Sequence, residues 1–159
     1  MIDLTLNQLL RQKTAANRNH VFMVYAVRDL RFTYAEFDKR VDNLACGLYA
    51  IGVRKGDNLG IWATNVPDWL TYMFACARLG AVAVTVNTSY KLHELEYLVK
   101  QSDLKVLCLS DGMKDSNYVQ MIKELVPELD TYERGCLKSE RVPCLNIVVF
   151  MGPEKFRGL

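Results

Sequence analysis

The chain contains few of the residues and patterns that carry catalysis. Its 159 residues include only two histidines, His20 and His93. His93 lies next to Glu94 and near Glu96, but this spacing matches no metal motif, so we interpret it as part of a solvated helix face. The sequence has no GxSxG, no GxGxxG and no glycine-rich loop followed by lysine. These absences argue against a hydrolase nucleophile elbow and against the common phosphate-binding loops.

The sequence also lacks a marked excess of positive or negative charge, and it lacks long apolar runs. Twenty basic and 18 acidic residues are interspersed and leave a net charge of +2, so nothing indicates nucleic acid or an anionic membrane as a partner. The longest apolar stretch, 69–86, is interrupted by Arg78 and Gly80 and is too short to cross a bilayer. The N-terminus has no basic region followed by an apolar run, so we expect no secretory signal.

Cysteine usage favours a reducing compartment. The five cysteines are odd in number and include no CxxC pair. Cys46, Cys76 and Cys108 fall on apolar faces of expected elements, so we predict that they are buried. Cys136 and Cys144 could form a disulfide, but a cytoplasmic protein with free thiols is the simpler interpretation.

What the sequence does contain is an alternation of strand and helix patterns. Around the most informative stretch, strands are predicted at 58–63 and 81–86, with a helix from Pro67 to Leu79 that Asn65 could cap and Gly80 ends. Further helices are predicted at 6–13, 34–51, 92–101 and 119–126. Further strands are predicted at 21–26, 30–32, 104–109 and 146–151, with an irregular connection at 127–145. Continuous apolar strands alternating with helices predict one α/β domain over 1–159, with a mainly parallel sheet covered by helices on both faces.

Candidate ligand-binding residues are scarce at this level. Ser110-Asp111-Gly112 follows a predicted strand, where doubly wound sheets bind ligands, but a single glycine is typical of a plain turn. Trp62 and Trp69 are predicted to pack against the sheet. The residues taken alone therefore indicate an α/β domain without a visible site.

The order of several short motifs indicates a protein family. Seven blocks occur in sequence: FTYAEF at 32–37, GVRKGD at 52–57, NVPDW at 65–69, RLGAV at 78–82, VNTSY at 86–90, ELEYL at 94–98 and SDLKVL at 102–107. In order and spacing they resemble adenylate-forming enzymes, the acyl-CoA synthetases and their relatives. Within that family, ELEYL and the later LKSERVP at 137–143 look most like medium- and long-chain fatty acyl-CoA synthetases.

This resemblance implies a ligase that uses ATP, Mg²⁺ and CoA. A carboxylate, such as a fatty acid, would be joined to AMP and then transferred to CoA. The family's Ser/Thr/Gly-rich loop, aromatic-Thr-Glu motif, ribose-binding Asp and C-terminal lysine are absent here, and 152–155 (GPEK) only superficially resembles the end of that loop. We therefore expect an N-terminal fragment of an AMP-binding domain that is inactive alone, with no catalytic residue, no metal ligand and no tightly bound cofactor.

By position in the family, the residues nearest the CoA nucleotide would be Asn87, Ser89 and Lys114. Two other classes stay open. The chain could be a non-catalytic α/β binding or oligomerisation module, for example a homodimer, since members of this family often dimerise. A small Rossmann-like nucleotide binder is less well supported, because its phosphate-binding fingerprint is missing.

Overall fold

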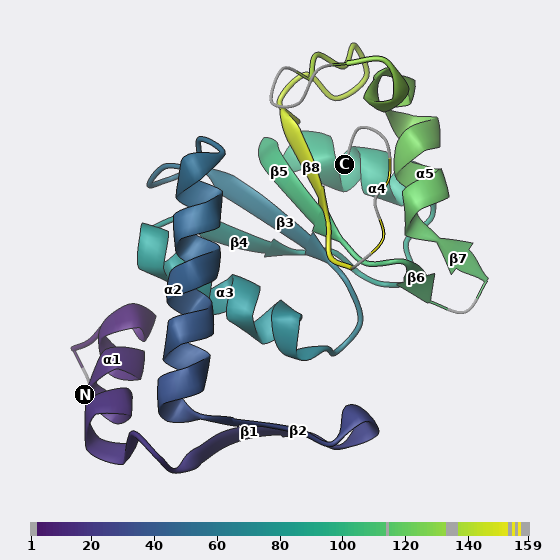
Figure 1. Cartoon of the computed structure of the whole chain (residues 1–159). Helices are drawn as coiled ribbons and strands as arrows, with labels where there is room; N and C mark the ends of the chain where they lie inside the picture. Colours follow the sequence, from purple (N-terminus) through teal and green to yellow (C-terminus); the bar gives the residue numbers. More distant parts are fainter. Residues whose placement is uncertain (1–2, 114, 133–136, 153, 155, 157–159) are drawn as a thin grey trace. The chain divides into compact units, whose positions relative to one another are not determined.

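The computed structural model describes residues 3–113, 115–132, 137–152, 154 and 156 (Figure 1). Its chain forms two compact units. The first comprises Met1–Gly56 and Val66–Ala81, and the second comprises Asp57–Asn65 and Val82–Leu159. The helix and strand patterns predicted from the sequence are distributed over both units.

The first unit is mainly helical. Its elements are α1 (Leu6–Asn17), β1 (Val21–Tyr25), a 3₁₀ turn η1 (Ala26–Arg28), β2 (Leu30–Thr33), α2 (Tyr34–Ala50) and α3 (Pro67–Leu79). Strands β1 and β2 lie at the runs predicted at 21–26 and 30–32, and they pair antiparallel as a hairpin. Helix α1 extends four residues beyond the predicted end at Lys13.

Helix α2 begins with a complete capping box. The Glu36 amide donates to the Thr33 hydroxyl at 3.2 Å, and the Glu36 carboxylate accepts from the Thr33 amide at 2.8 Å. These bonds satisfy amides that have no partner inside the helix. The pKa of Glu36 is lowered, because this carboxylate accepts from the Thr33 amide and hydroxyl. The helix start is thus at Tyr34, where the sequence predicted it.

Arg78 joins the three helices of the first unit. From α3, its guanidinium donates to Asp38 at 2.6 Å and to Asp42 at 2.5 Å on α2, and to the Asn7 side chain on α1 at 2.9 Å. Arg11 of α1 pairs with the same two carboxylates. Because the side chains of Arg78 and Asp38 are only 10% and 11% exposed, these charges are stabilised by each other rather than by water.

The second unit contains a four-stranded parallel sheet. Its strands are β3 (Asn58–Trp62), β4 (Val82–Thr85), β5 (Leu104–Leu109) and β8 (Ile147–Phe150), in the order β4-β3-β5-β8. Its other elements are α4 (Leu92–Gln101), the short strands β6 (Gly112–Met113) and β7 (Ser116–Asn117), α5 (Tyr118–Leu125) and the 3₁₀ turn η2 (Pro127–Asp130). All pairs of the four-stranded sheet are parallel, as predicted.

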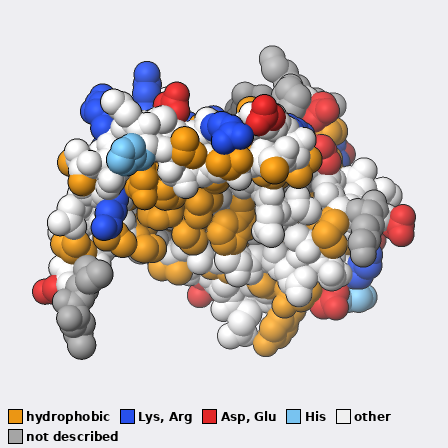
Figure 2. All heavy atoms as spheres, turned by 90° about the horizontal axis from the view of Figure 1, so that it is seen from below, with side chains coloured by type: hydrophobic (Ala, Val, Ile, Leu, Met, Phe, Trp, Pro, Cys, Tyr) orange, Lys and Arg blue, Asp and Glu red, His pale blue; other side chains and the backbone are white. Residues whose placement is uncertain are grey.

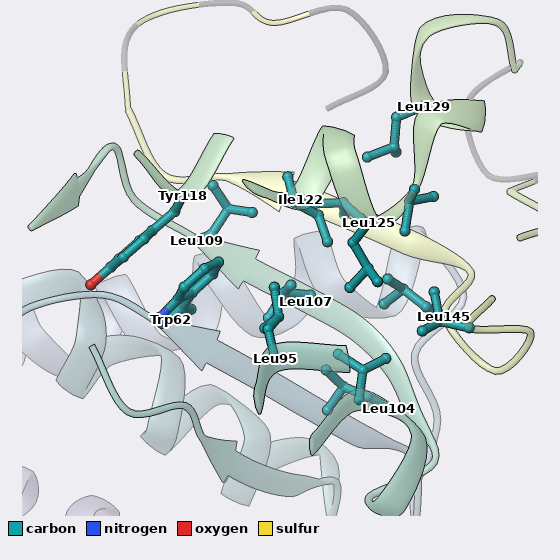
Figure 3. Close-up of a cluster of buried hydrophobic side chains, with 14 of the residues drawn as sticks. Trp62, Leu95, Leu104, Leu107, Leu109, Tyr118, Ile122, Leu125, Leu129 and Leu145 are labelled. Atoms are coloured by element: carbon teal, nitrogen blue, oxygen red, sulfur yellow. The ribbon is translucent and has the colours of Figure 1, made fainter. Parts of the chain in front are cut away.

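One face of this sheet carries a continuous hydrophobic core. Side chains from β3, β5, β8, α4 and α5 gather there, as Figure 3 shows. They include Trp62, Leu95, Leu104, Leu107, Leu109, Tyr118, Ile122, Leu125, Leu129 and Leu145. Leu59, Ile61, Val106 and Cys108 alternate with them along the strands and are buried too. Both faces of the central strands are therefore removed from water, which explains their unbroken apolar sequences.

Two local predictions were wrong. Asn65 does not cap α3, because the N-cap position is Val66 and no side chain bonds there; Pro67 at the first turn starts the helix without needing an amide partner. Cys46 is exposed rather than buried, whereas Cys76 and Cys108 are buried. Burial of Cys76 raises the pKa of its thiol to about 12, so it behaves as a small apolar side chain.

The end of α3 gives a first prediction. Gly80 has φ +70°, and an added Cβ would lie 3.0 Å from Cγ of Lys55. We expect Gly80→Ala to lower the free energy of unfolding by about 1–2 kcal/mol, because an L-residue is strained in this conformation. Urea denaturation of the chain measures the change.

Gly47 provides the matched control. It lies within α2, is exposed, and an added Cβ would meet nothing within 4 Å. Gly47→Ala should therefore raise the free energy of unfolding by about 0.5–1 kcal/mol. Equal effects of the two substitutions would contradict the assignment of a conformational role to Gly80.

A second prediction concerns the Arg78 network. Arg78→Met leaves Asp38 and Asp42 with Arg11 as their remaining partner, so the free energy of unfolding should fall by about 3 kcal/mol, the low end for breaking a buried pair. Arg31→Met is the control, since the Arg31–Asp29 pair is 3.8 Å long and largely exposed. It should cost less than about 0.5 kcal/mol.

The pH dependence of the same comparison tests its electrostatic origin. Asp42 is partly desolvated, which alone would raise its pKa, but Arg11 and Arg78 hold that pKa below the ordinary 3.8. Stability from this carboxylate is thus present above pH 3.8 and is lost as acid protonates it in the folded state. The difference between wild type and Arg78→Met should shrink below that pH. A constant difference would indicate that only packing is lost.

Candidate functional site at the carboxyl edge of the sheet

Strands β3, β4 and β5 are parallel, so they end at the same edge of the sheet. Three loops of the second unit begin there, at 63–65, 86–91 and 110–117. In open α/β sheets, ligands bind outside this edge. The predicted site residues Asn87 and Ser89 lie on the second of these loops.

The loop after β4 is shaped by hydrogen bonds to Asn87. Its side-chain oxygen accepts from the Ser89 amide at 2.9 Å, and its carbonyl accepts from the Tyr90 amide at 3.1 Å. This is the Asx turn that Asn side chains favour. Asn87 and Ser89 are exposed, so the turn presents both side chains at the surface.

Two buried aromatic residues support this loop from below. The indole Nε1 of Trp62 donates to the carbonyl of Asn87 at 3.1 Å, and the Tyr118 hydroxyl donates to the carbonyl of Thr88 at 2.8 Å. The two rings are stacked, with centroids 3.8 Å apart and planes inclined by 13° (Figure 3). Burial raises the pKa of Tyr118, although its bond to Thr88 opposes this, so the phenol stays protonated and can donate.

The loop after β5 forms a small hairpin, β6–β7. Gly112 has φ +148°, and an added Cβ would lie 2.0 Å from the Ser116 carbonyl oxygen, so only glycine fits. The Nζ of Lys91 donates to the Ser116 hydroxyl at 2.7 Å and thereby links the two loops. We predicted a plain turn at 110–112 and missed this hairpin. Asp-Gly at 111–112 does not mark its turn, because Gly112 already pairs with Asn117 in the ladder, so the usual hairpin signal was missing.

An open cavity of about 340 Å³ lies beside the hairpin. It is lined by Asp111, Asn117, Val119, Gln120, Lys123 and Phe156. Several of these groups already have partners: the Asn117 side chain caps α5 through the Gln120 amide at 2.9 Å, and Lys123 pairs with Asp130 at 2.6 Å. Two of the four polar side chains in the lining therefore hold the protein together.

The structure brings together two of the three predicted cofactor-binding residues. Asn87 and Ser89 share one turn, whereas Lys114 lies outside the described residues. Trp62 packs in the core as predicted, but no pattern in the sequence indicated that Tyr118 bonds to the loop. Its spacing with Ile122 and Leu125 indicated only a buried helix face.

This edge presents hydrogen-bonding side chains at the surface, on the turn at 87–89. His20 and His93, the only histidines, do not lie on these loops, and His93 is exposed on α4 as predicted. Within the described part of the chain, no three His, Cys, Asp or Glu side chains gather as a metal site.

The face drawn in Figure 2 carries charges of both signs. On the face drawn in Figure 2, basic and acidic side chains are mixed, with hydrophobic side chains between them. This agrees with the near balance of charges in the sequence. None of the helices described is long and apolar enough to cross a membrane.

Comparison with known proteins identifies the family. The profile for "AMP-binding enzyme" matches residues 10–153. Over all 159 residues the chain is 42% identical to YngI of Bacillus subtilis, described as a candidate acyl-CoA synthetase, and covers 29% of that protein. It is 37% identical over 127 residues to the human mitochondrial medium-chain acyl-CoA ligase ACSF2, covering 80% of this chain and 21% of the relative. The chain thus spans less than a third of the length of these relatives.

Solved structures share the fold. A fatty acyl CoA synthetase of Mycobacterium tuberculosis superposes with a TM-score of 0.77 at 22% identity, covering 92% of this chain and 26% of that one. The N-terminal domain of FACL13 from the same organism superposes with a TM-score of 0.77. The match covers 92% of this chain and 34% of the FACL13 chain. The anthranilate CoA ligase AuaEII, solved with anthranoyl-AMP, gives 0.75 at 20% identity, covering 93% of this chain and 25% of its own.

The family match over most of the chain and the similarity to these relatives agree with the fold and with the resemblance carried by the seven sequence blocks. The chain belongs to the AMP-binding enzyme family and corresponds to the N-terminal portion of its acyl-CoA synthetases.

Proposed function

We propose that the chain is the N-terminal part of an ATP-dependent fatty acid–CoA ligase. The observation that carries this proposal is the 42% identity along its whole length to YngI, a relative described as a candidate acyl-CoA synthetase. The human relative named a medium-chain acyl-CoA ligase supports a medium- or long-chain fatty acid as substrate.

The proposed reaction has two steps. The fatty acid carboxylate attacks the α-phosphorus of ATP, and the bond from this phosphorus to the oxygen that bridges to the β-phosphate breaks. Pyrophosphate is released, and an acyl-adenylate remains. The CoA thiol then attacks the acyl carbon, AMP leaves, the thiol proton is released, and a thioester forms. Mg²⁺ would assist the complete ligase by neutralising phosphate charge. Since the described residues offer no ligand set for the metal, we assign none of them to it.

Within this reaction, the role we propose for this chain is binding the nucleotide end of CoA. The turn at 87–89 presents an amide and a hydroxyl, which are groups that donate to phosphate and ribose oxygens. Among the described residues, neither the side-chain nitrogen Nδ2 of Asn87 nor the Ser89 hydroxyl has a hydrogen-bond partner. Both groups are therefore available to donate to a ligand. Lys114 would add a positive charge, on the strength of its sequence position alone.

A cytoplasmic location is part of the same proposal. Cys46 and Cys76 carry thiols, which suits a reducing compartment. The human relative is named as mitochondrial, so cell fractionation with an antibody to the chain would decide between the two locations.

The alternative function is a non-catalytic oligomerisation module. It is favoured by the sheet edges, because β4 and β8 each pair with one strand among those described, and unpaired edges invite association. Sedimentation of the purified chain separates the possibilities. A homodimer at micromolar concentration would support the module, and a monomer at high concentration would exclude it.

For the ligase proposal, we expect the 159-residue chain alone to give no fatty-acid-dependent ATP–pyrophosphate exchange above a blank. The reason is that the phosphate-holding loop, the aromatic-Thr-Glu motif and the C-terminal lysine of the family are not in this sequence. Exchange by the purified chain would overturn the prediction of inactivity.

The coding sequence beyond codon 159 supplies the positive control. If it continues into a Ser/Thr/Gly-rich loop and Pro-Lys-Gly, the longer product should catalyse the exchange and then form acyl-CoA. A stop codon directly after 159 would argue against the ligase proposal and for the module.

A further inference from the structure

The loop at 87–90 rests on two aromatic residues that come from different elements. Trp62 ends β3 and Tyr118 begins α5, and both are fully buried. Each uses its single polar atom to hold a carbonyl, and the two carbonyls belong to neighbouring residues, Asn87 and Thr88. The loop backbone is therefore fixed at two consecutive points.

Core packing does not by itself require this arrangement. A buried phenol or indole needs a hydrogen-bond partner, but any nearby acceptor satisfies it. Here the stacked rings, 3.8 Å apart, keep the two donors at a set separation. The loop's own bonds, from the amides of Ser89 and Tyr90 to Asn87, complete the turn above them.

We propose that Tyr118 is a positioning residue that acts through the Thr88 carbonyl. Its phenol holds the 87–90 loop in the conformation that presents Asn87 and Ser89 to the CoA nucleotide. Trp62 does the same through the Asn87 carbonyl. This inference rests on the proposed function for the identity of the ligand, and on the structure for the mechanism of support.

The test is amide hydrogen exchange, followed by NMR, on the purified chain carrying Tyr118→Phe. This change keeps the stacked ring and removes the hydroxyl. The amides of Ser89 and Tyr90 should exchange roughly three- to tenfold faster, as expected for one lost hydrogen bond, while amides of β5 keep their rates. Trp62→Phe should accelerate the same amides.

Tyr97→Phe is the matched control, because Tyr97 is 69% exposed and also lies in the second unit. It should change no rate at 89–90. Two results would overturn the inference: unchanged exchange at Ser89 and Tyr90 in both test variants, or a uniform acceleration that includes β5. The second would mean that Tyr118 only stabilises the fold.

A separate titration with adenosine 3′,5′-bisphosphate, which represents the nucleotide end of CoA, tests the ligand. Wild type and Tyr97→Phe should show saturable shifts of the 87–90 amide resonances, and Tyr118→Phe should bind several-fold more weakly. If the loop loosens in Tyr118→Phe but wild type shows no shifts, the CoA role proposed for the loop fails while the positioning role stands. Equal binding by all three proteins would overturn positioning.

Discussion

Parallel pairing of β3 with β4 on one side and β5 on the other is the constraint on which the candidate site depends. In the observed register Gly60 lies opposite Val84 and Leu107, so the three strands run in one direction and end at one edge. Parallel strands cannot be joined by tight hairpins, and the chain must cross over between them. The loops at 86–91 and 110–117 are brought together by this requirement.

The same buried stack serves as core and as support for a surface loop. Trp62 and Tyr118 belong to the hydrophobic cluster over the sheet, and their two polar atoms reach the loop above it. Surface loops are usually the mobile parts of a fold. Here the carbonyls of Asn87 and Thr88 are tied to side chains that cannot move without disturbing the core.

The blocks that carried the family resemblance have structural roles in this chain. Thr33 and Glu36 cap α2, Gly80 ends α3 with a positive φ, and Asn87 makes the turn after β4. Glu94 accepts from the Lys91 amide at 2.7 Å at the start of α4. These motifs shape the backbone, so they indicate the family and its fold rather than a reaction.

Predictions from the sequence succeeded where the deciding contacts are local. The bounds of α3, α4 and β5 are those predicted, since periodicity, proline and glycine act within a few residues. The prediction that Asn65 caps α3 was wrong because the presence of a residue type that can cap does not decide which residue occupies the N-cap position. The prediction that Cys46 is buried was wrong because the width of the buried face of α2 depends on the elements that pack against it.

The sequence by itself therefore determined the main helices and strands, the parallel sheet and the family, but not the β6–β7 hairpin. Only the tertiary structure decided which residues meet. The bond from Tyr118 to Thr88 spans 30 residues and that from Arg78 to Asp38 spans 40. Such contacts depend on how several elements pack at once, because a phenol or guanidinium can satisfy its hydrogen bonds in many ways and the folded core selects one.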